Sequence, residues 1–109
     1  IYKEKLKNLP ITLPFEEEKN SKHAYHLFTI IINSNREHFI NYLKKNKIGI
    51  GIHYNSIGSF NFYKNKVKNF SKVPKSNYIG ERILSLPLYE SLKKKELNFI
   101  IEKITKYFD

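Results

Sequence analysis

The sequence predicts a small α/β or α+β layer structure, in which helices cover a small sheet. One apolar, β-branched segment, residues 24–32, has the composition of a central strand. Two further segments, near 35–46 and 94–108, repeat apolar residues at helical spacing and need a sheet face to cover. The 109 residues are enough for one modest domain, residues 1–109, and too few for two ordinary ones.

The N-terminal residues predict the end of a helix followed by an extended connection. Tyr2 and Leu6 lie four residues apart and so share one helix face. Pro10 and Pro14 then favour extended chain, because proline fixes its own φ and disfavours helix in the residue before it. The polar residues 16–22 predict a surface turn.

The segment 24–32 is nearly continuously apolar toward its end, so we expect that end of a central strand to be buried on both faces. Ser34 and Glu37 after it form a capping-box pattern, with Ser34 as the N-cap of a helix that runs to about Asn46. The apolar residues on one side of this helix are Phe39, Ile40 and Leu43.

The middle of the chain predicts a short strand and a long loop. Residues 48–54 alternate with period two, and Gly49 and Gly51 there would let another backbone or a ligand approach closely. Residues 55–77 are rich in Asn, Ser and Lys and hold one short helical turn, around 60–66. A loop of that length inside a compact domain is typical of a functional segment.

The C-terminal part predicts a short helix over 76–84 and a second strand-like piece. Pro87 restricts the piece 85–89 to a sheet edge or to an extended path outside the sheet. The final helix, 94–108, carries its apolar residues on one face, and Phe99 lies on the opposite face. We therefore expect Phe99 to be exposed or to contact another chain or domain.

Composition excludes several classes of protein and site. The sequence has no Cys, which excludes a disulfide framework, a Cys-based zinc site and a thiol nucleophile. It has no apolar run long enough to span a membrane and no export signal at its start, which favours the cytoplasm. His23 and His26 would point to opposite faces of a strand, so we expect no metal site. No catalytic motif is complete within this sequence, and the absence of Met at its start indicates part of a longer protein.

A basic region offers an alternative function. Between His38 and Gly80 there is no acidic residue, while eight lysines are interleaved with aromatic residues, a composition that can bind single-stranded nucleic acid. The lysines are Lys44, Lys45, Lys47, Lys64, Lys66, Lys68, Lys72 and Lys75, and the aromatic residues are Tyr54, Phe60, Phe62, Tyr63 and Phe70. Lys outnumbers Arg 18 to 2, which argues against specific recognition and for a solvated lysine surface over core aromatics.

Five motifs occur in a fixed order along the chain. They are His23 to Ile30 (HAYHLFTI), Asn35-Arg36-Glu37 at the start of a helix, Ile48 to Tyr54 (IGIGIHY), the pair Phe62-Tyr63, and Leu84 to Tyr89 (LSLPLY). Each motif is weak alone, but together they resemble the C-terminal domain of the DegT/DnrJ/EryC1/StrS family over nearly the whole chain. Members of this family have the aspartate-aminotransferase fold (fold type I).

The resemblance implies an enzyme that uses pyridoxal 5'-phosphate (PLP) and an amino-acid donor to aminate a keto group on a nucleotide-linked sugar, for surface polysaccharide or glycan biosynthesis. In this family the Schiff-base lysine and most PLP contacts lie in a large N-terminal domain, which is absent here. The resemblance therefore implies no catalytic and no cofactor-binding residue in this chain, which alone would be inactive. It also implies a homodimer for the full-length enzyme.

The family resemblance places the substrate near the segment from Gly51 to Tyr63. The candidate substrate-binding residues are His53, Tyr54, Asn55 and Tyr63. Many members read H-Y-x-P-x-H-x-Q-P-x-Y here, whereas this chain has Gly58 for the second His and Phe60 for the Gln. This departure leaves the identity of the sugar open, and also leaves open a diverged, non-catalytic interaction domain. From the residues alone, His53 could equally be a half-buried histidine with a backbone hydrogen bond.

Overall fold

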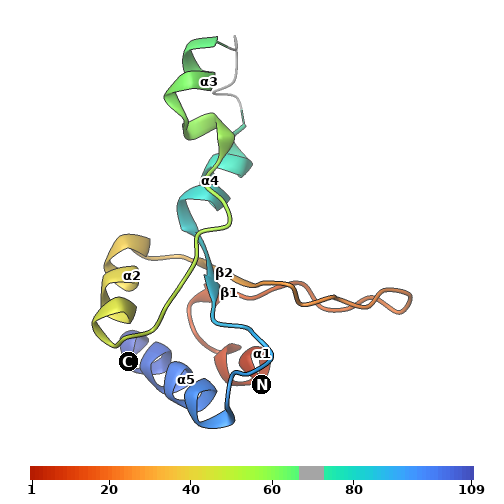
Figure 1. Cartoon of the computed structure of the whole chain (residues 1–109). Coiled ribbons are helices and arrows are strands. Elements are labelled where there is room, and N and C mark those ends of the chain that lie inside the picture. The colour runs from red at the N-terminus through yellow and green to blue at the C-terminus, as the bar shows by residue number, and fades with distance from the viewer. Residues whose placement is uncertain (67–72) are drawn as a thin grey trace.

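The computed structural model describes residues 1–66 and 73–109. In chain order the elements are α1 (Tyr2–Leu6), β1 (Ile11–Thr12), β2 (Phe28–Ile32), α2 (Arg36–Lys45), the 3₁₀ turn η1 (Ile57–Ser59), α3 (Asn61–Lys66), α4 (Pro74–Arg82), β3 (Ile83–Leu86) and α5 (Lys94–Phe108). Within the described residues, three strands form one antiparallel sheet in the order β1–β2–β3 (Figure 1). The predicted class, a small sheet covered by helices, is confirmed.

The central position predicted for the strand before α2 is confirmed, but its length is not. β2 begins at Phe28, and residues 24–27 belong to a long exposed loop, 13–27, that projects from the body (Figure 1). The predicted start at residue 24 is wrong because no neighbouring strand extends that far. Phe28 pairs with Leu86, the last residue of β3, and Pro87 after it lacks the N–H needed to extend the ladder.

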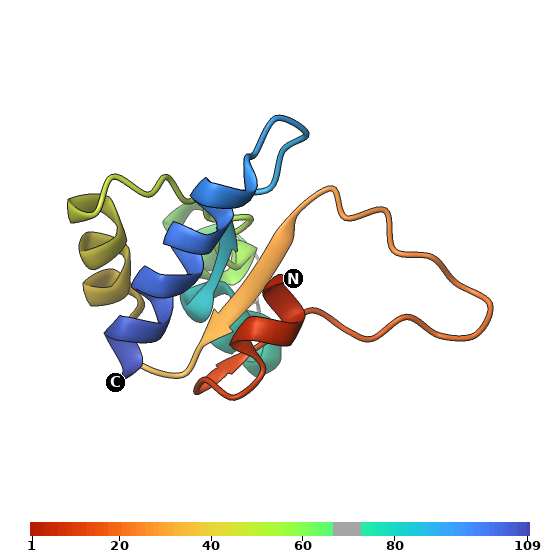
Figure 2. The same ribbon diagram turned by 90° about the horizontal axis from the view of Figure 1, so that it is seen from below.

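The buried face of β2 carries the core. Phe28, Ile30 and Ile32 alternate inward and are at most 4% exposed. The core residues contributed by α1, α2 and α5 are Tyr2, Leu6, Phe39, Leu43, Ile100 and Ile104. Figure 2 shows α5 and α1 lying across one side of the sheet.

The opposite face of β2 is only half-buried, at Thr29 and Ile31. The expectation that this strand end is buried on both faces is therefore wrong. The reason is that α1, α2 and α5 all contribute to the core on the other face.

Helix α2 begins one residue later than the capping-box pattern suggests. Its N-cap is Asn35 rather than Ser34, and the Asn35 side-chain oxygen accepts a hydrogen bond from the His38 N–H at 3.0 Å. Both residue types cap helices well, so the sequence alone does not decide between neighbours. The predicted end near Asn46 and the buried face of Phe39, Ile40 and Leu43 are confirmed.

The strand predicted over 48–54 is wrong. Gly51 makes a single bridge to Ser85, through hydrogen bonds of 3.2 and 2.8 Å between their backbones, and no named strand forms there. After the bridge the chain leaves β3 and runs into η1 and α3. The helical turn around 60–66 is confirmed as α3, and the predicted loop ends at α4.

The second helix and strand of the C-terminal part are shifted from their predicted ranges. The helix expected over 76–84 spans Pro74–Arg82, with Pro74 at the first helical position, which suits proline. The piece 85–89 was expected at a sheet edge or on an extended path outside the sheet. Its first two residues belong to the edge strand β3 (Ile83–Leu86), and Pro87 lies beyond that strand. Residues 67–72 of the predicted loop, with Lys68, Phe70 and Lys72, lie outside the described residues.

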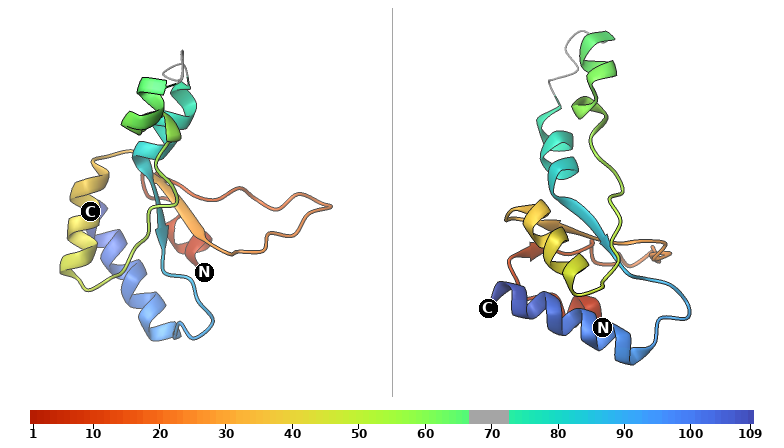
Figure 3. Two further views of the ribbon diagram at one scale, coloured as in Figure 1. Left: turned by 45° about the horizontal axis from the view of Figure 1, so that its top comes forward. Right: turned by 60° about the vertical axis from the view of Figure 1, so that its left-hand side comes forward.

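Helices α3 and α4 with η1 form a lobe that projects from the sheet, away from α1 and α5 (Figures 1 and 3). Helix α5 has the predicted range, and Phe99 on it is 42% exposed, as expected. In the parts of the chain that the structure describes, no helix is both long and apolar enough to cross a membrane.

Two phenylalanines allow a matched test of the core. Phe39 has no exposed surface and contacts the ring of Tyr107 at a centroid distance of 4.7 Å. Phe39→Ala is expected to lower the free energy of unfolding by about 3–5 kcal/mol, because it leaves a cavity. Phe99→Ala, at a half-exposed position, is expected to cost less than about 1 kcal/mol.

Urea unfolding followed by circular dichroism measures both values. Phe39→Leu is the substitute where the alanine variant is unfolded in water, and it should cost less than the alanine but more than Phe99→Ala. Equal midpoints for the Phe39 and Phe99 variants would contradict the core described above.

Candidate functional site

His53 lies at the edge of the sheet, where the backbone bridge between Gly51 and Ser85 fixes its position. Its Nδ1 lies 2.9 Å from the Ser85 hydroxyl, and the ring is half-buried. The hydrogen-bond partner is thus a side chain rather than the backbone group considered above. Tyr54 packs edge-on against the imidazole at a centroid distance of 5.2 Å, while remaining 76% exposed.

A shallow hollow of about 410 Å³ adjoins His53. It is lined by Leu27, Gly49, Ile50, Gly51, His53, Ser85, Leu86, Pro87 and Tyr89. Ser85 is buried, with 3% of its surface exposed, and its hydroxyl is hydrogen-bonded to His53. This hydrogen bond holds the imidazole in a fixed orientation at the hollow. A fixed imidazole can donate or accept one further hydrogen bond through Nε2.

The two glycines before His53 differ in their surroundings. A Cβ on Gly51 would collide with the His53 ring, so only glycine fits beside that imidazole. A Cβ on Gly49 would meet no atom within 4 Å. The close approach predicted for both glycines therefore occurs at Gly51 alone, where it is made by the Ser85 backbone and by the His53 side chain.

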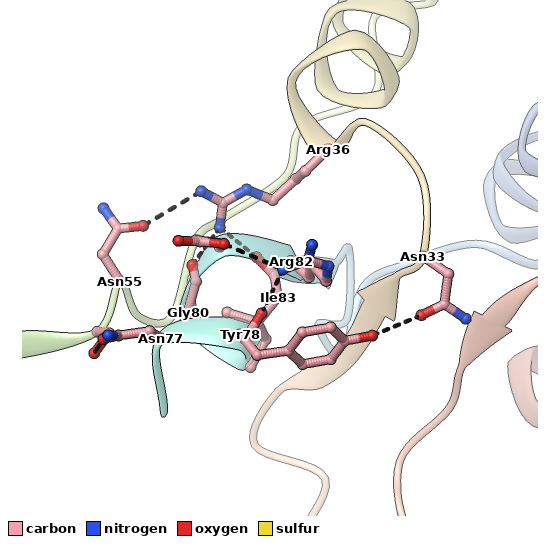
Figure 4. A network of polar contacts seen from close by, with 10 residues as sticks. Asn33, Arg36, Asn55, Asn77, Tyr78, Gly80, Arg82 and Ile83 are labelled. Atoms are coloured by element: carbon pink, nitrogen blue, oxygen red, sulfur yellow. Dashed lines mark hydrogen bonds and ion pairs between the residues drawn. The ribbon is translucent and has the colours of Figure 1, made fainter. Parts of the chain in front are cut away.

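Asn55 belongs to a second, more polar hollow of about 250 Å³ at the base of the lobe. Its side-chain oxygen accepts a hydrogen bond from Nη2 of Arg36 at 3.4 Å (Figure 4). Nη1 of the same guanidinium donates to the carbonyl oxygens of Gly80 and Ile83, at 2.8 and 3.0 Å. The lining residues are Arg36, Asn55, Ser56, Ser59, Asn77, Gly80 and Glu81.

The structure brings together only part of the predicted site. His53 and Tyr54 lie in contact, and Asn55 turns toward the second hollow. Tyr63 lies on α3, and its ring packs edge-on against Phe62. Helix α3 belongs to the projecting lobe (Figure 1). Neither Tyr54 nor Tyr63 lines either of these two hollows.

The described residues contain no group of three or more His, Asp or Glu side chains placed to hold a metal ion. The buried polar side chains among them are Ser56 and Ser85, and none of the lysines whose burial the structure describes is buried. A lysine that binds PLP covalently needs an enclosed pocket to lower its pKa and exclude water.

Shifted pKa values lie away from His53. Burial raises the pKa of the Tyr2 phenol well above its ordinary value, and Tyr89 raises it further. The Tyr2 hydroxyl donates to the Pro87 carbonyl oxygen at 3.1 Å, which fixes the chain just after β3. On α5, a hydrogen bond from Lys103 lowers the pKa of Glu102. Both shifts are caused by burial or by a neighbouring side chain.

Sequence reasoning missed Arg36, Ser56 and Ser85 as members of the two hollows. Arg36 offers one signal, since it is one of two arginines in a lysine-rich chain. It also lies in the first turn of α2, where the helix dipole disfavours a cation. The serines give no such signal, because their partners are 32 and 21 residues distant in sequence.

The model of the DegT/DnrJ/EryC1/StrS aminotransferase family matches residues 1–105. The chain belongs to this family. An uncharacterized protein of Methanocaldococcus jannaschii is 31% identical over 97% of this chain. The chain spans 29% of the length of that relative.

Two solved structures show the same fold. Spr1654 of Streptococcus pneumoniae, in a PLP form, superposes with a TM-score of 0.86 at 23% identity, over 96% of this chain and 28% of its own. The sugar aminotransferase CalS13 of Micromonospora echinospora gives 0.77 at 13% identity, over 96% of this chain and 27% of its own. Membership of the DegT/DnrJ/EryC1/StrS family does not favour the nucleic-acid-binding alternative.

The geometry at Gly51 gives a test with a matched control. Gly51→Ala is expected to cost about 1–3 kcal/mol, because the new methyl group collides with the His53 ring. Gly49→Ala is expected to change the free energy of unfolding by no more than about 1 kcal/mol, because its methyl group meets no neighbour.

Urea unfolding of Gly51→Ala, His53→Ala and the double variant measures the coupling. We expect the Gly51→Ala cost to fall by more than half once the imidazole is removed. An unchanged cost in the His53→Ala background would show that the imidazole does not lie over Gly51.

Proposed function

We propose that this chain is the C-terminal domain of a longer PLP-dependent aminotransferase that aminates a keto group on a nucleotide-linked sugar. The family match over residues 1–105 carries the proposal. The chain covers 29% of its Methanocaldococcus jannaschii relative and 28% of Spr1654, which supports a partner domain elsewhere in the longer protein. The PLP form of Spr1654 supports the cofactor, and CalS13 supports a sugar substrate.

In this proposal the PLP-binding lysine and phosphate contacts belong to the rest of the longer protein. The exposure of the lysines whose side chains the structure describes supports that division, because none of them is buried. We therefore assign no step of the reaction on PLP to this chain. Its part is to bind and orient the sugar nucleotide beside the cofactor domain. An amino acid supplies the amino group.

We propose His53, Tyr54, Asn55 and Tyr63 as the substrate-binding residues. The half-buried His53 and the exposed phenol of Tyr54 offer donors and acceptors for sugar hydroxyls. The acid-free sequence from His38 to Gly80 adds a positive potential that attracts a diphosphate linker. The enzyme would act as a homodimer in the cytoplasm, in surface polysaccharide or glycan biosynthesis.

The first experiment uses the longer protein that contains this chain. Purified with PLP, it should transfer an amino group from an amino acid to a keto sugar nucleotide. His53→Ala should lower kcat/KM for the sugar nucleotide about tenfold or more, which corresponds to the loss of one or two hydrogen bonds. The absorption band of bound PLP should stay unchanged.

His38→Ala is the matched control, because His38 lies on α2 and its Nδ1 contacts the Tyr107 hydroxyl at 2.7 Å instead. The control should keep kcat/KM within about twofold. Equal kinetics for both variants would remove His53 from the substrate site. Loss of the PLP band in His53→Ala would move that residue to the cofactor, and absence of transfer in the wild-type protein would overturn the proposed activity.

A second experiment uses the 109-residue chain alone. Titrated with PLP, it should give no stoichiometric absorption band of a lysine-bound cofactor, because none of the lysines whose burial the structure describes is buried. The longer protein is the positive control. A band at one PLP per chain that disappears on replacement of a single lysine would contradict the assignment of the PLP-binding lysine to the rest of the longer protein.

A further inference from the structure

Arg36 joins three segments that are distant in sequence. It lies in the first turn of α2, and its guanidinium reaches the carbonyl oxygens of Gly80 and Ile83 and the side chain of Asn55 (Figure 4). A planar guanidinium presents donors on separate nitrogens in a fixed geometry, whereas the ammonium of lysine carries its three donors on a single nitrogen. Arg36 thus connects the helix that covers the core to the base of the lobe.

The two backbone acceptors explain why a cation is stabilised here. Gly80 lies in the last turn of α4 and Ile83 is its C-cap, where carbonyl oxygens lack partners within the helix and the dipole is negative. The Arg36 side chain is half-buried, so these hydrogen bonds are partly protected from water. Arg36 therefore caps α4 from a neighbouring helix.

The same point of the fold holds the segment after Tyr54. Gly80 lies so close to the backbone of Ser56 that a Cβ on Gly80 would collide with the Ser56 N atom. The buried Ser56 hydroxyl lies 2.7 Å from the Asn77 side-chain oxygen, accepts the Gly58 N–H at 3.2 Å, and so ties η1 to α4. Whatever fixes the end of α4 therefore fixes residues 55–59 as well.

We propose that Arg36 is a positioning residue: by capping α4 and holding Asn55, it sets the path of residues 53–59 and hence the orientation of His53 and Tyr54 toward the substrate. Arg36 itself does not contact the substrate and acts only through His53 and Tyr54, so this part of the proposal rests on the proposed function. Its structural part concerns this chain alone and can be tested separately.

Hydrogen exchange of the 109-residue chain, read by mass spectrometry, tests the structural part. Arg36→Gln should speed exchange about tenfold or more in peptides that cover 56–60 and the end of α4, because the lost hydrogen bonds involve a charged group. Exchange in α5 should stay unchanged. Arg36→Lys should speed exchange by an intermediate amount, since it keeps the positive charge but lacks the planar guanidinium.

Arg82→Gln is the control, because it removes the same charge from α4. The variant loses a hydrogen bond to the Tyr78 carbonyl oxygen and an ion pair with Glu81, but no hydrogen bond to residues 53–59. It should leave exchange over 56–60 unchanged. Equal acceleration in α5 and in 56–60 for Arg36→Gln would show a loss of global stability only and would overturn the proposal. So would an effect of Arg82→Gln over 56–60 as large as that of Arg36→Gln.

Kinetics of the longer protein test the functional part. Arg36→Gln should raise KM for the sugar nucleotide about tenfold, with kcat within about twofold and KM for the amino donor unchanged, and Arg36→Lys should restore part of the loss. A fall in kcat with unchanged KM would overturn this assignment. A wild-type protein without transfer activity would refute the proposed function and the functional part together, whereas the exchange result would still decide the structural part.

Discussion

The pairing of β2 with β3 fixes where every other element can lie. Its register places Phe28, Ile30 and Ile32 on one face, and α1, α2 and α5 remove these side chains from water. Burial of each such side chain is worth about 1.5–3 kcal/mol, which is a large share of the stability of a domain this size. The same pairing puts Ser85 beside Gly51, so the core of the sheet also sets the position of His53.

Features with a local cause could be predicted from the sequence. Helices α2 and α5 repeat apolar residues every three or four positions, and their ranges agree closely with the prediction because that spacing is set within one element. Strand ends were predicted less well, since they depend on where a partner stops. β2 begins at Phe28 because β3 ends at Leu86, although residues 24–27 have good strand composition. Residues 48–54 likewise alternate with period two in the sequence, but they form one backbone bridge, from Gly51 to Ser85, and no strand.

The candidate site also contains residues that the sequence indicates and residues that only the structure reveals. His53 and Tyr54 stand out in the sequence, as polar and aromatic residues at the end of a glycine-containing segment. Ser85 gives no signal in the sequence, and Arg36 is marked only by the rarity of arginine and its place in the first turn of α2. Their hydrogen-bond partners are 19 to 47 residues away. Tyr63, chosen by family resemblance, lies on the projecting lobe. Its different position from Tyr54 could be seen only in the three-dimensional structure.

The contact between Ser56 and Gly80 has a consequence for how such chains can change in length. It brings the two ends of the segment from Ser56 to Gly80 into contact, so this segment is a closed loop attached to the sheet. The entropy of closing a loop grows only slowly with the number of residues in it. Insertions or deletions beyond this junction are therefore expected to leave the register of β2 and β3 intact.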